Sequence, residues 1–280
     1  MTTKPILISG GGIGGCACAL ALSNNGFTCQ VFEQSTEFAE IGAGIQLGPN
    51  VHKMFKALGI DKEIEKIAFY PDNLIMRDAL NGKEITRVDL GKPFLERFKA
   101  PYGVIHRADL HKVIYQSCLE SENIDLLTSV SIVDFEEYSD GVRAIADDGT
   151  SYDGMALIGA DGLWSEIRPK IVGDGKPRVS GHVAYRAVLP VEEVPKEVCS
   201  DDVVLWAGPK THLVHYKLRR GELFNIVAVF HSDKYEEGWD AFGDPEELNK
   251  RFQNERPEVH MLLDKIEDWR MWVLLSLIHI

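Results

Sequence analysis

The chain is poor in the features that mark secreted and membrane-spanning proteins. It has only five cysteines in 280 residues, an odd number with no regular spacing. Such usage favours reduced thiols over a disulfide framework. No apolar run approaches the roughly 20 residues of a membrane span, and the first residues lack the apolar core of a signal peptide. We therefore expect a cytoplasmic protein with no membrane partner.

Positive charge is also scarce. The chain has 30 Lys and Arg against 43 Asp and Glu, which gives a formal net charge of −13. Because nucleic acid repels an acidic surface, no nucleic-acid partner is expected. Cys16 and Cys18 lie in a segment with helical spacing, where small side chains suit packing against a sheet, so no metal site is expected either. An anionic ligand must be held by local donors.

Glycine, by contrast, is concentrated near the N-terminus, where residues 10–15 are GGGIGG. The apolar segment PILIS before it predicts a buried strand, and IGGCACALALSNNG after it has the spacing of a helix. TCQVFE then predicts a second strand that ends at Glu33. This order, with G-x-G-x-x-G at Gly10, Gly12 and Gly15, indicates a dinucleotide-binding unit.

Each residue of this unit has a physical role in the hypothesis. Gly10 permits a tight turn, Gly12 lets a pyrophosphate approach the backbone, and Gly15 lets the helix pack closely on the strand. The helix N-terminus offers free N–H groups to phosphate, and Glu33 can accept both ribose hydroxyls. The motif alone does not separate NAD from FAD, and a glycine-rich loop without a ligand is the alternative interpretation.

Two later segments carry polar residues at the ends of predicted elements. Arg107 precedes the helical pattern HRADLHKVIYQSCLE, and MALIGADG predicts a strand that runs into a turn at Asp161 and Gly162. Considered alone, Arg107 is typical of a surface residue. The Asp-Gly pair is likewise typical of a turn that caps a helix.

The region after Ile171 has short runs of β-branched and aromatic residues, which predict an antiparallel sheet. In the segment HLVHY, strand alternation puts His212, Val214 and Tyr216 on one face, while Leu213 and His215 take the other. A half-exposed strand explains such a pattern without any function.

Together, the glycine motif with Glu33 and the segment GADGLWSEIR resemble the single-component FAD-dependent aromatic hydroxylases over residues 4 to about 274. The resemblance implies an α/β fold with a Rossmann-type FAD-binding domain, residues 1–69 and 99–175. An interleaved, mainly antiparallel β-sheet substrate domain would take residues 70–98 and 176–274. It also implies FAD as cofactor and NADH or NADPH as co-substrate. The implied cofactor-binding residues are Gly10, Gly12, Gly14, Gly15, Glu33, Gln46, Arg107, Asp161 and Gly162.

Within this family, the segments EIGAGIQLGPN, HRADLH and LWAGPKTHLVHY resemble the branch that hydroxylates 3-hydroxybenzoate. The resemblance implies that His212 and Tyr216 are the catalytic pair, acting on a small aromatic carboxylate with O2. A base that accepts the phenol proton raises electron density para to that oxygen, so the expected product is 2,5-dihydroxybenzoate (gentisate). The alternatives are a decarboxylating hydroxylation of salicylate and an inactive flavin-binding fragment. A homodimer is compatible with either activity.

One motif of this family, G-D-A-x-H-x-x-x-P, is not in the sequence, and its final residues LSLIHI, 275–280, do not resemble the family. Our interpretation is a C-terminally truncated chain with a non-native tail. A natural apolar strand at this point is the alternative.

Overall fold

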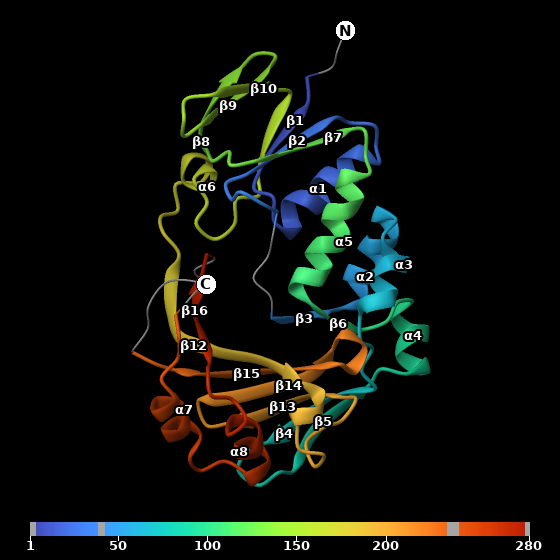
Figure 1. Ribbon diagram of the computed structural model, residues 1–280, viewed down its shortest axis with the longest axis vertical. Helices are drawn as coiled ribbons and strands as arrows, with labels where there is room; N and C mark the ends of the chain where they lie inside the picture. The colour runs from blue at the N-terminus through green and yellow to red at the C-terminus, as the bar shows by residue number, and fades with distance from the viewer. Residues whose placement is uncertain (1–3, 39–42, 234–240, 278–280) are drawn as a thin grey trace. The chain divides into compact units, whose positions relative to one another are not determined.

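The structure is a computed structural model, and it describes residues 4–38, 43–233 and 241–277. The chain divides into two compact units, each built from separate stretches of sequence (Figure 1). The first unit contains Met1–Ile41, Met54–Glu65 and Arg107–Pro177, and the second contains Gly42–Lys53, Lys66–His106 and Arg178–Ile280. The sequence-based boundaries had placed residues 42–53, 66–69 and 99–106 with the first unit and residues 176–177 with the second. The α/β fold class predicted from the sequence is confirmed.

A four-stranded parallel sheet in the order β11-β1-β2-β7 forms the centre of the first unit. Its strands are β1 (Ile6–Ser9), β2 (Cys29–Glu33), β7 (Ile124–Thr128) and β11 (Ala156–Gly159). β1 is fully buried, as its continuous apolar run requires in a parallel sheet. The predicted strands before and after the glycine loop are therefore confirmed.

Two helices, α1 (Ile13–Ser23) and α5 (Arg107–Leu119), pack against each other beside this sheet (Figure 1). Buried small residues on α1, among them Cys16 and Ala19, permit the close approach. The short α6 (Ile167–Ile171) follows β11. Two further helices, α2 (Pro49–Leu58) and α3 (Asp61–Ile67), include residues of both units.

A small antiparallel sheet, β10-β9-β8, completes the first unit. Its strands are β8 (Ile132–Tyr138), β9 (Gly141–Ala146) and β10 (Ser151–Gly154). A turn at Asp148-Gly149 joins β9 to β10, with Gly149 at φ +86°. The side chains of Leu7, Phe32 and Ala144 belong to one apolar core, which joins this sheet to the parallel one.

The second unit is built on a seven-stranded sheet in the order β16-β12-β15-β14-β13-β4-β5. Five of its six strand pairs are antiparallel, and the pair of β13 with β4 is parallel. The strands are β4 (Asn73–Asp78), β5 (Glu84–Asp89), β12 (Arg178–Pro190), β13 (Val203–Gly208), β14 (Thr211–Leu218), β15 (Leu223–His231) and β16 (Arg270–Ser276). Leu275 and Ser276, assigned to a tail from the sequence, thus pair with β12; residues 278–280 lie outside the described residues.

Helices α7 (Pro245–Phe252) and α8 (Pro257–Leu263) pack on one face of this sheet and share its core (Figure 1). Asp244 caps α7 by accepting the N–H groups of Glu246 and Glu247. The core contains Leu213, Phe224 and Phe230 from the sheet together with Leu248 and Phe252 from α7.

The opposite face of the sheet meets the two-stranded ladder β3 (Gly44–Leu47) and β6 (Gly103–His106). Gly44 is pressed so closely on this face that an added Cβ would lie 2.7 Å from the Tyr216 hydroxyl. Helix α4 (Lys92–Phe98) also belongs to the second unit.

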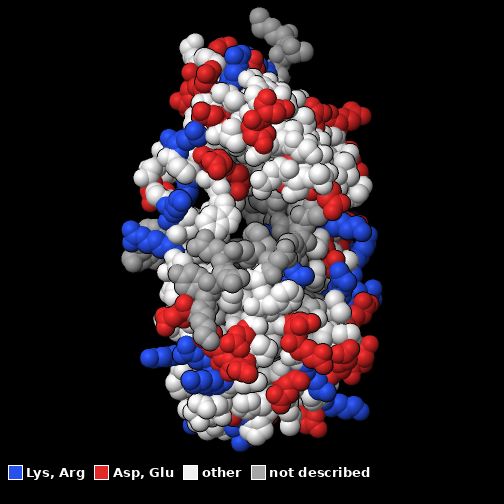
Figure 2. Space-filling model, turned by 60° about the vertical axis from the view of Figure 1, so that its left-hand side comes forward, with Lys and Arg blue, Asp and Glu red and all other residues white. Residues whose placement is uncertain are grey.

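The surface carries charges of both signs. Figure 2 shows carboxylates spread over the visible face, with lysines and arginines among them. Within the described residues, no helix is long and apolar enough to cross a membrane, and no group of three or more histidine, cysteine or acidic side chains is arranged to hold a metal ion.

Candidate functional site

The glycine loop of the first unit leaves no room for side chains at two of its positions. Gly10 has φ +105°, and a Cβ there would lie 2.3 Å from the carbonyl oxygen of Ala160. A Cβ on Gly15 would lie 1.9 Å from the carbonyl oxygen of Gly10. These contacts agree with the tight turn and the close helix packing predicted for the two glycines. Gly12 is the N-cap of α1.

The opposite situation holds at Gly14, where a Cβ would meet no heavy atom within 4 Å. The loop thus has one face packed on the protein and one face of bare backbone that borders open space. Backbone N–H groups at the start of a helix attract a pyrophosphate in such a setting.

Glu33 lies at the end of β2 and is tied to the loop. Its Oε2 accepts the N–H of Gly11 at 3.0 Å, and its Oε1 accepts the N–H of Ser35 at 2.8 Å. The carboxylate is therefore held beside the loop, in the position where the motif requires an acceptor for ribose hydroxyls.

Asp161 uses both of its oxygens within its own turn. Its Oδ1 accepts from the Ser165 hydroxyl at 2.5 Å, and its Oδ2 accepts the N–H groups of Glu166 at 2.9 Å and Ile167 at 3.1 Å. Gly162 follows with φ +78° and open space around it. The structure thus shows the helix-capping turn that was the simpler interpretation of this segment, and a role toward the cofactor stays a prediction.

Two other predicted cofactor residues lie in different units. Arg107 is the first residue of α5 and is half-buried in the first unit. Gln46 is in β3 of the second unit, where its Oε1 accepts a hydrogen bond from the Tyr102 hydroxyl. Its side chain also bonds Tyr216. The structure therefore groups Gln46 with the predicted substrate residues.

The predicted alternation along β14 is observed. Leu213 packs into the core beneath α7 and α8, and His215 faces the same side, where its Nε2 accepts the indole N–H of Trp206 at 3.2 Å. Val214 and Tyr216 pack in a separate apolar cluster on the other face. His212 is two residues before Val214 and shares that face.

The two histidines of β14 have different environments. His212 is half-buried, and burial together with the charge of His182 lowers its pKa. His215 is only 2% exposed, and burial lowers its pKa to about 3, with Arg77 adding to the effect. Both imidazoles are neutral near pH 7, but only His212 is half-buried on the face away from α7 and α8, where a neutral imidazole can accept a proton from a ligand.

The ring of Tyr216 is buried in an apolar cluster of the second unit, and its hydroxyl bonds the side chain of Gln46. Burial raises its pKa far above the usual range, against a smaller opposing effect from Arg186. Burial also raises the pKa of Tyr102 to about 12. Asn225, which pairs with Tyr216 in the sheet, accepts the N–H of Gly44 at 2.8 Å. Tyr216 is therefore a fixed part of this face, with its hydroxyl protonated at neutral pH.

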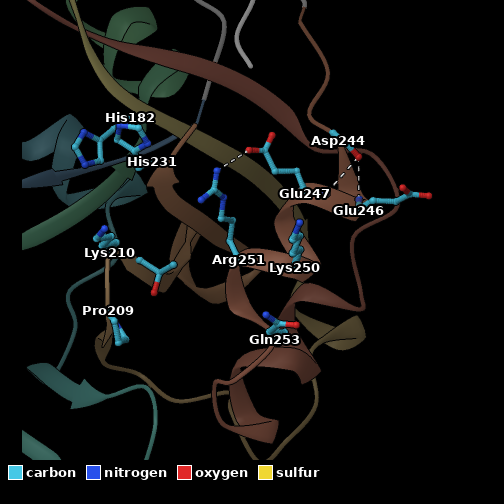
Figure 3. A pocket seen from close by; sticks show the side chains of 11 residues that line it. His182, Pro209, Lys210, His231, Asp244, Glu246, Glu247, Lys250, Arg251 and Gln253 are labelled. Atoms are coloured by element: carbon cyan, nitrogen blue, oxygen red, sulfur yellow. Dashed lines mark hydrogen bonds and ion pairs between the residues drawn. The ribbon is translucent and has the colours of Figure 1, made fainter. Parts of the chain in front are cut away.

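A cavity of about 1020 Å³ lies at the end of the sheet where β13 turns into β14. Figure 3 shows His182 and His231 on one side of it and Glu247, Lys250 and Arg251 of α7 on the other, with Arg251 paired to Glu247 at 3.3 Å. His182 pairs with His231 across β12 and β15. His182, whose charge helps to lower the pKa of His212, therefore lines this cavity.

Three residues of these sites were not predicted from the sequence. His111 bonds the glycine loop, His182 acts on His212, and Asn225 anchors Gly44 beside Tyr216. His111 follows Leu110 on the apolar side of the predicted helix. A histidine at such a position is a signal that the sequence offers. The other two depend on strand pairing, which no local pattern supplies.

Comparison with known proteins adds the family. The FAD binding domain family matches residues 3–274. The 3-hydroxybenzoate 6-hydroxylase of Polaromonas naphthalenivorans is 42% identical over 268 residues, which are 96% of this chain and 67% of that protein. The enzyme of the same name from Klebsiella oxytoca is 41% identical over 266 residues, 95% of this chain and 67% of that protein.

Solved structures show the same fold at lower identity. A salicylate hydroxylase in complex with its substrate has a TM-score of 0.82 at 21% identity, over 98% of this chain and 69% of that chain. Klebsiella pneumoniae HpxO in complex with FAD and uric acid also has a TM-score of 0.82, at 24% identity, over 97% of this chain and 68% of that chain. The chain belongs to the FAD binding domain family, within the FAD-dependent aromatic hydroxylases, and its cofactor is FAD.

The first unit fits this cofactor. The bare loop face at Gly14 leaves space for a pyrophosphate, and the Glu33 carboxylate is held beside the loop by two backbone N–H groups. Both features suit a dinucleotide bound at this loop.

Proposed function

We propose that the protein hydroxylates 3-hydroxybenzoate to 2,5-dihydroxybenzoate, with O2 and NADH or NADPH as co-substrates. Relatives that are 40–42% identical carry the name 3-hydroxybenzoate 6-hydroxylase. Carbon 6 of this substrate is para to its hydroxyl group, so 6-hydroxylation and 2,5-dihydroxybenzoate describe one reaction.

The observation that carries the proposal is the half-buried, neutral His212 on the face of β14 away from α7 and α8. His212 accepts the phenol proton, which raises electron density at the para carbon. Bound FAD would supply the oxidising chemistry, an electrophilic oxygen derived from O2 with electrons from the nicotinamide co-substrate. Among the described residues, none donates a hydrogen bond to the imidazole of His212. The imidazole is therefore available to accept from the substrate.

Tyr216 has a different part in the proposal. Because its side chain is buried and its hydroxyl bonds Gln46, it supports the edge of the substrate ring. The valines that flank it on the same face, Val214 and Val203, extend this apolar support. We propose in addition that Gln46, Arg107 and Asp161 contact FAD, as the family resemblance implies.

The experiment is a product assay on FAD-loaded protein. Each of 3-hydroxybenzoate and salicylate is supplied with NADH or NADPH in air, and products are identified by chromatography with authentic standards. We expect 2,5-dihydroxybenzoate from 3-hydroxybenzoate. Formation of catechol and CO2 from salicylate, with 3-hydroxybenzoate unchanged, contradicts the proposal and assigns the decarboxylating reaction instead.

A further inference from the structure

The peptide groups of the glycine loop are fixed by contacts that the dinucleotide motif does not contain. Gly11 donates its N–H to Glu33, and its carbonyl oxygen accepts two hydrogen bonds from the protein side of the loop. The first comes from Nε2 of His111 at 2.8 Å, and the second from the thiol of Cys16 at 3.1 Å. Since a carbonyl oxygen can only accept, Nε2 of His111 carries a hydrogen.

His111 is buried and stacked on a neighbouring ring. The side chain is 3% exposed, and its ring lies parallel to that of Tyr115, with ring centres 6.1 Å apart and planes at 7°. Tyr115 stacks in turn on Phe38, with centres 5.0 Å apart. The ring of Phe38 also packs against the loop, since a Cβ on Gly11 would lie 2.3 Å from it. Tyr115, backed by Phe38, thus holds the imidazole against one carbonyl oxygen.

The orientation of that carbonyl determines where the next N–H points. A trans peptide places C=O and N–H on opposite sides. Because the Gly11 oxygen is directed to α5, the N–H of Gly12 is directed away from α5. Gly12 is the N-cap of α1, where N–H groups and the helix dipole favour an anion. A rotated peptide would present the carbonyl oxygen to a phosphate and repel it.

We propose that His111 is a positioning residue for FAD binding, which holds the Gly11–Gly12 peptide in the orientation that offers its N–H to the pyrophosphate. His111 acts through Gly11 and does not itself contact the cofactor. Cys16 supports the same orientation with a weaker donor. This inference concerns the cofactor alone and holds whichever aromatic acid is the substrate.

The test measures FAD affinity of the apoprotein by titration with flavin fluorescence as the signal, together with the melting temperature of each apoprotein. The variants are His111→Leu, His111→Gln and His111→Asn. The Gln amide nitrogen is as many bonds from Cβ as Nε2 of histidine, whereas the Asn amide is one bond shorter. Ser23→Ala is the matched control. It removes a hydrogen bond of 2.7 Å between Ser23 on α1 and Ser121, and neither residue belongs to the glycine loop.

We expect His111→Leu and His111→Asn to weaken FAD binding about tenfold or more, as the loss of one buried hydrogen bond predicts. His111→Gln should restore binding to within about threefold. Ser23→Ala should leave the affinity unchanged. Equal weakening in the Gln and Asn variants, or unchanged binding in the Leu variant, overturns the proposal. If His111→Leu does not fold, the difference between Gln and Asn still decides the question.

Discussion

At the scale of single residues, His212 is the side chain on which the proposed chemistry depends. Replacing it with alanine removes the proton acceptor, so we expect His212→Ala to slow hydroxylation by roughly 10²–10⁴-fold. FAD binding should be unchanged because the glycine loop belongs to the other unit. The measurement is the yield of hydroxylated product per NADH consumed, which separates productive turnover from simple NADH oxidation.

His215 provides the control for this variant because it lies on the same strand with its ring turned into the core. Its Nε2 accepts from Trp206, so His215→Gln keeps an acceptor in place and should leave the product yield near that of the unchanged protein. A loss of hydroxylation in His215→Gln with normal yield in His212→Ala would contradict the assignment of the faces.

Glu255 is a second residue whose environment predicts a measurable effect. It is 9% exposed, and burial raises the pKa of its carboxyl group. Since the folded state then holds the proton more tightly than the unfolded state, this group favours folding at acid pH. The advantage is lost as the pH rises from about 4.5, the ordinary value, through the raised pKa.

We therefore expect Glu255→Gln to raise the melting temperature at pH 8 and to change it little at pH 4. The Gln oxygen still accepts the Thr211 hydroxyl, while the buried charge is gone. Glu258→Gln is the control because the neighbouring Arg256 lowers the pKa of Glu258. Removing the negative charge of Glu258 should therefore not stabilise the protein at pH 8. A lower melting temperature for Glu255→Gln at pH 8 would refute this account.

At the scale of elements, Gly14 and Gly15 form a matched pair at the start of α1. A Cβ on Gly15 would meet the Gly10 carbonyl oxygen at 1.9 Å, whereas a Cβ on Gly14 would meet nothing within 4 Å. We expect Gly15→Ala to separate α1 from the loop and destabilise the apoprotein by more than 1 kcal/mol, about the scale of overpacking. Gly14→Ala should stabilise it by up to about 1 kcal/mol through helix propensity.

Denaturant unfolding of the two apoproteins provides the measurement, with the free energy of unfolding as the quantity compared. Similar changes in both variants would show that close packing at Gly15 does not control the stability of α1. FAD is omitted because both glycines border its predicted site.

Local elements were predictable where their pattern was strong. The strands on either side of the glycine loop and α1 follow from apolar periodicity in the sequence. The parallel pairing of β13 with β4 was not predictable, because it joins segments about 130 residues apart in the chain. Short helices such as α4 and α8 have too few turns for a clear period.

The candidate site was predictable to the same degree. His212 and Tyr216 share a face because alternation is a local property of a strand. The association of Gln46 with Tyr102 and Tyr216 depends on the placement of β3 against the sheet, which the bare Gly44 permits. Tertiary packing of this kind leaves no signal in the spacing of residues.

At the scale of the whole molecule, the two units have separate apolar cores. Phe224 is fully buried in the core of the second unit, and Leu7 is fully buried in the core of the first. We expect Phe224→Ala to destabilise by roughly 3–5 kcal/mol and to lower hydrogen-exchange protection mainly in peptides of the second unit. Leu7→Ala should have its main effect in the first unit. Equal loss of protection in both units would show that they unfold as one.

The hydrogen bond between Trp206 and His215 links the fluorescence of an indole to the protonation of a buried imidazole. The indole is 5% exposed and donates to an imidazole that accepts only while it is neutral. Acid that forces a proton onto His215, whose pKa is about 3, breaks this pair and admits water to the ring. The emission of Trp206 should then shift to longer wavelength, so that a spectrum reports the integrity of the sheet that carries His212.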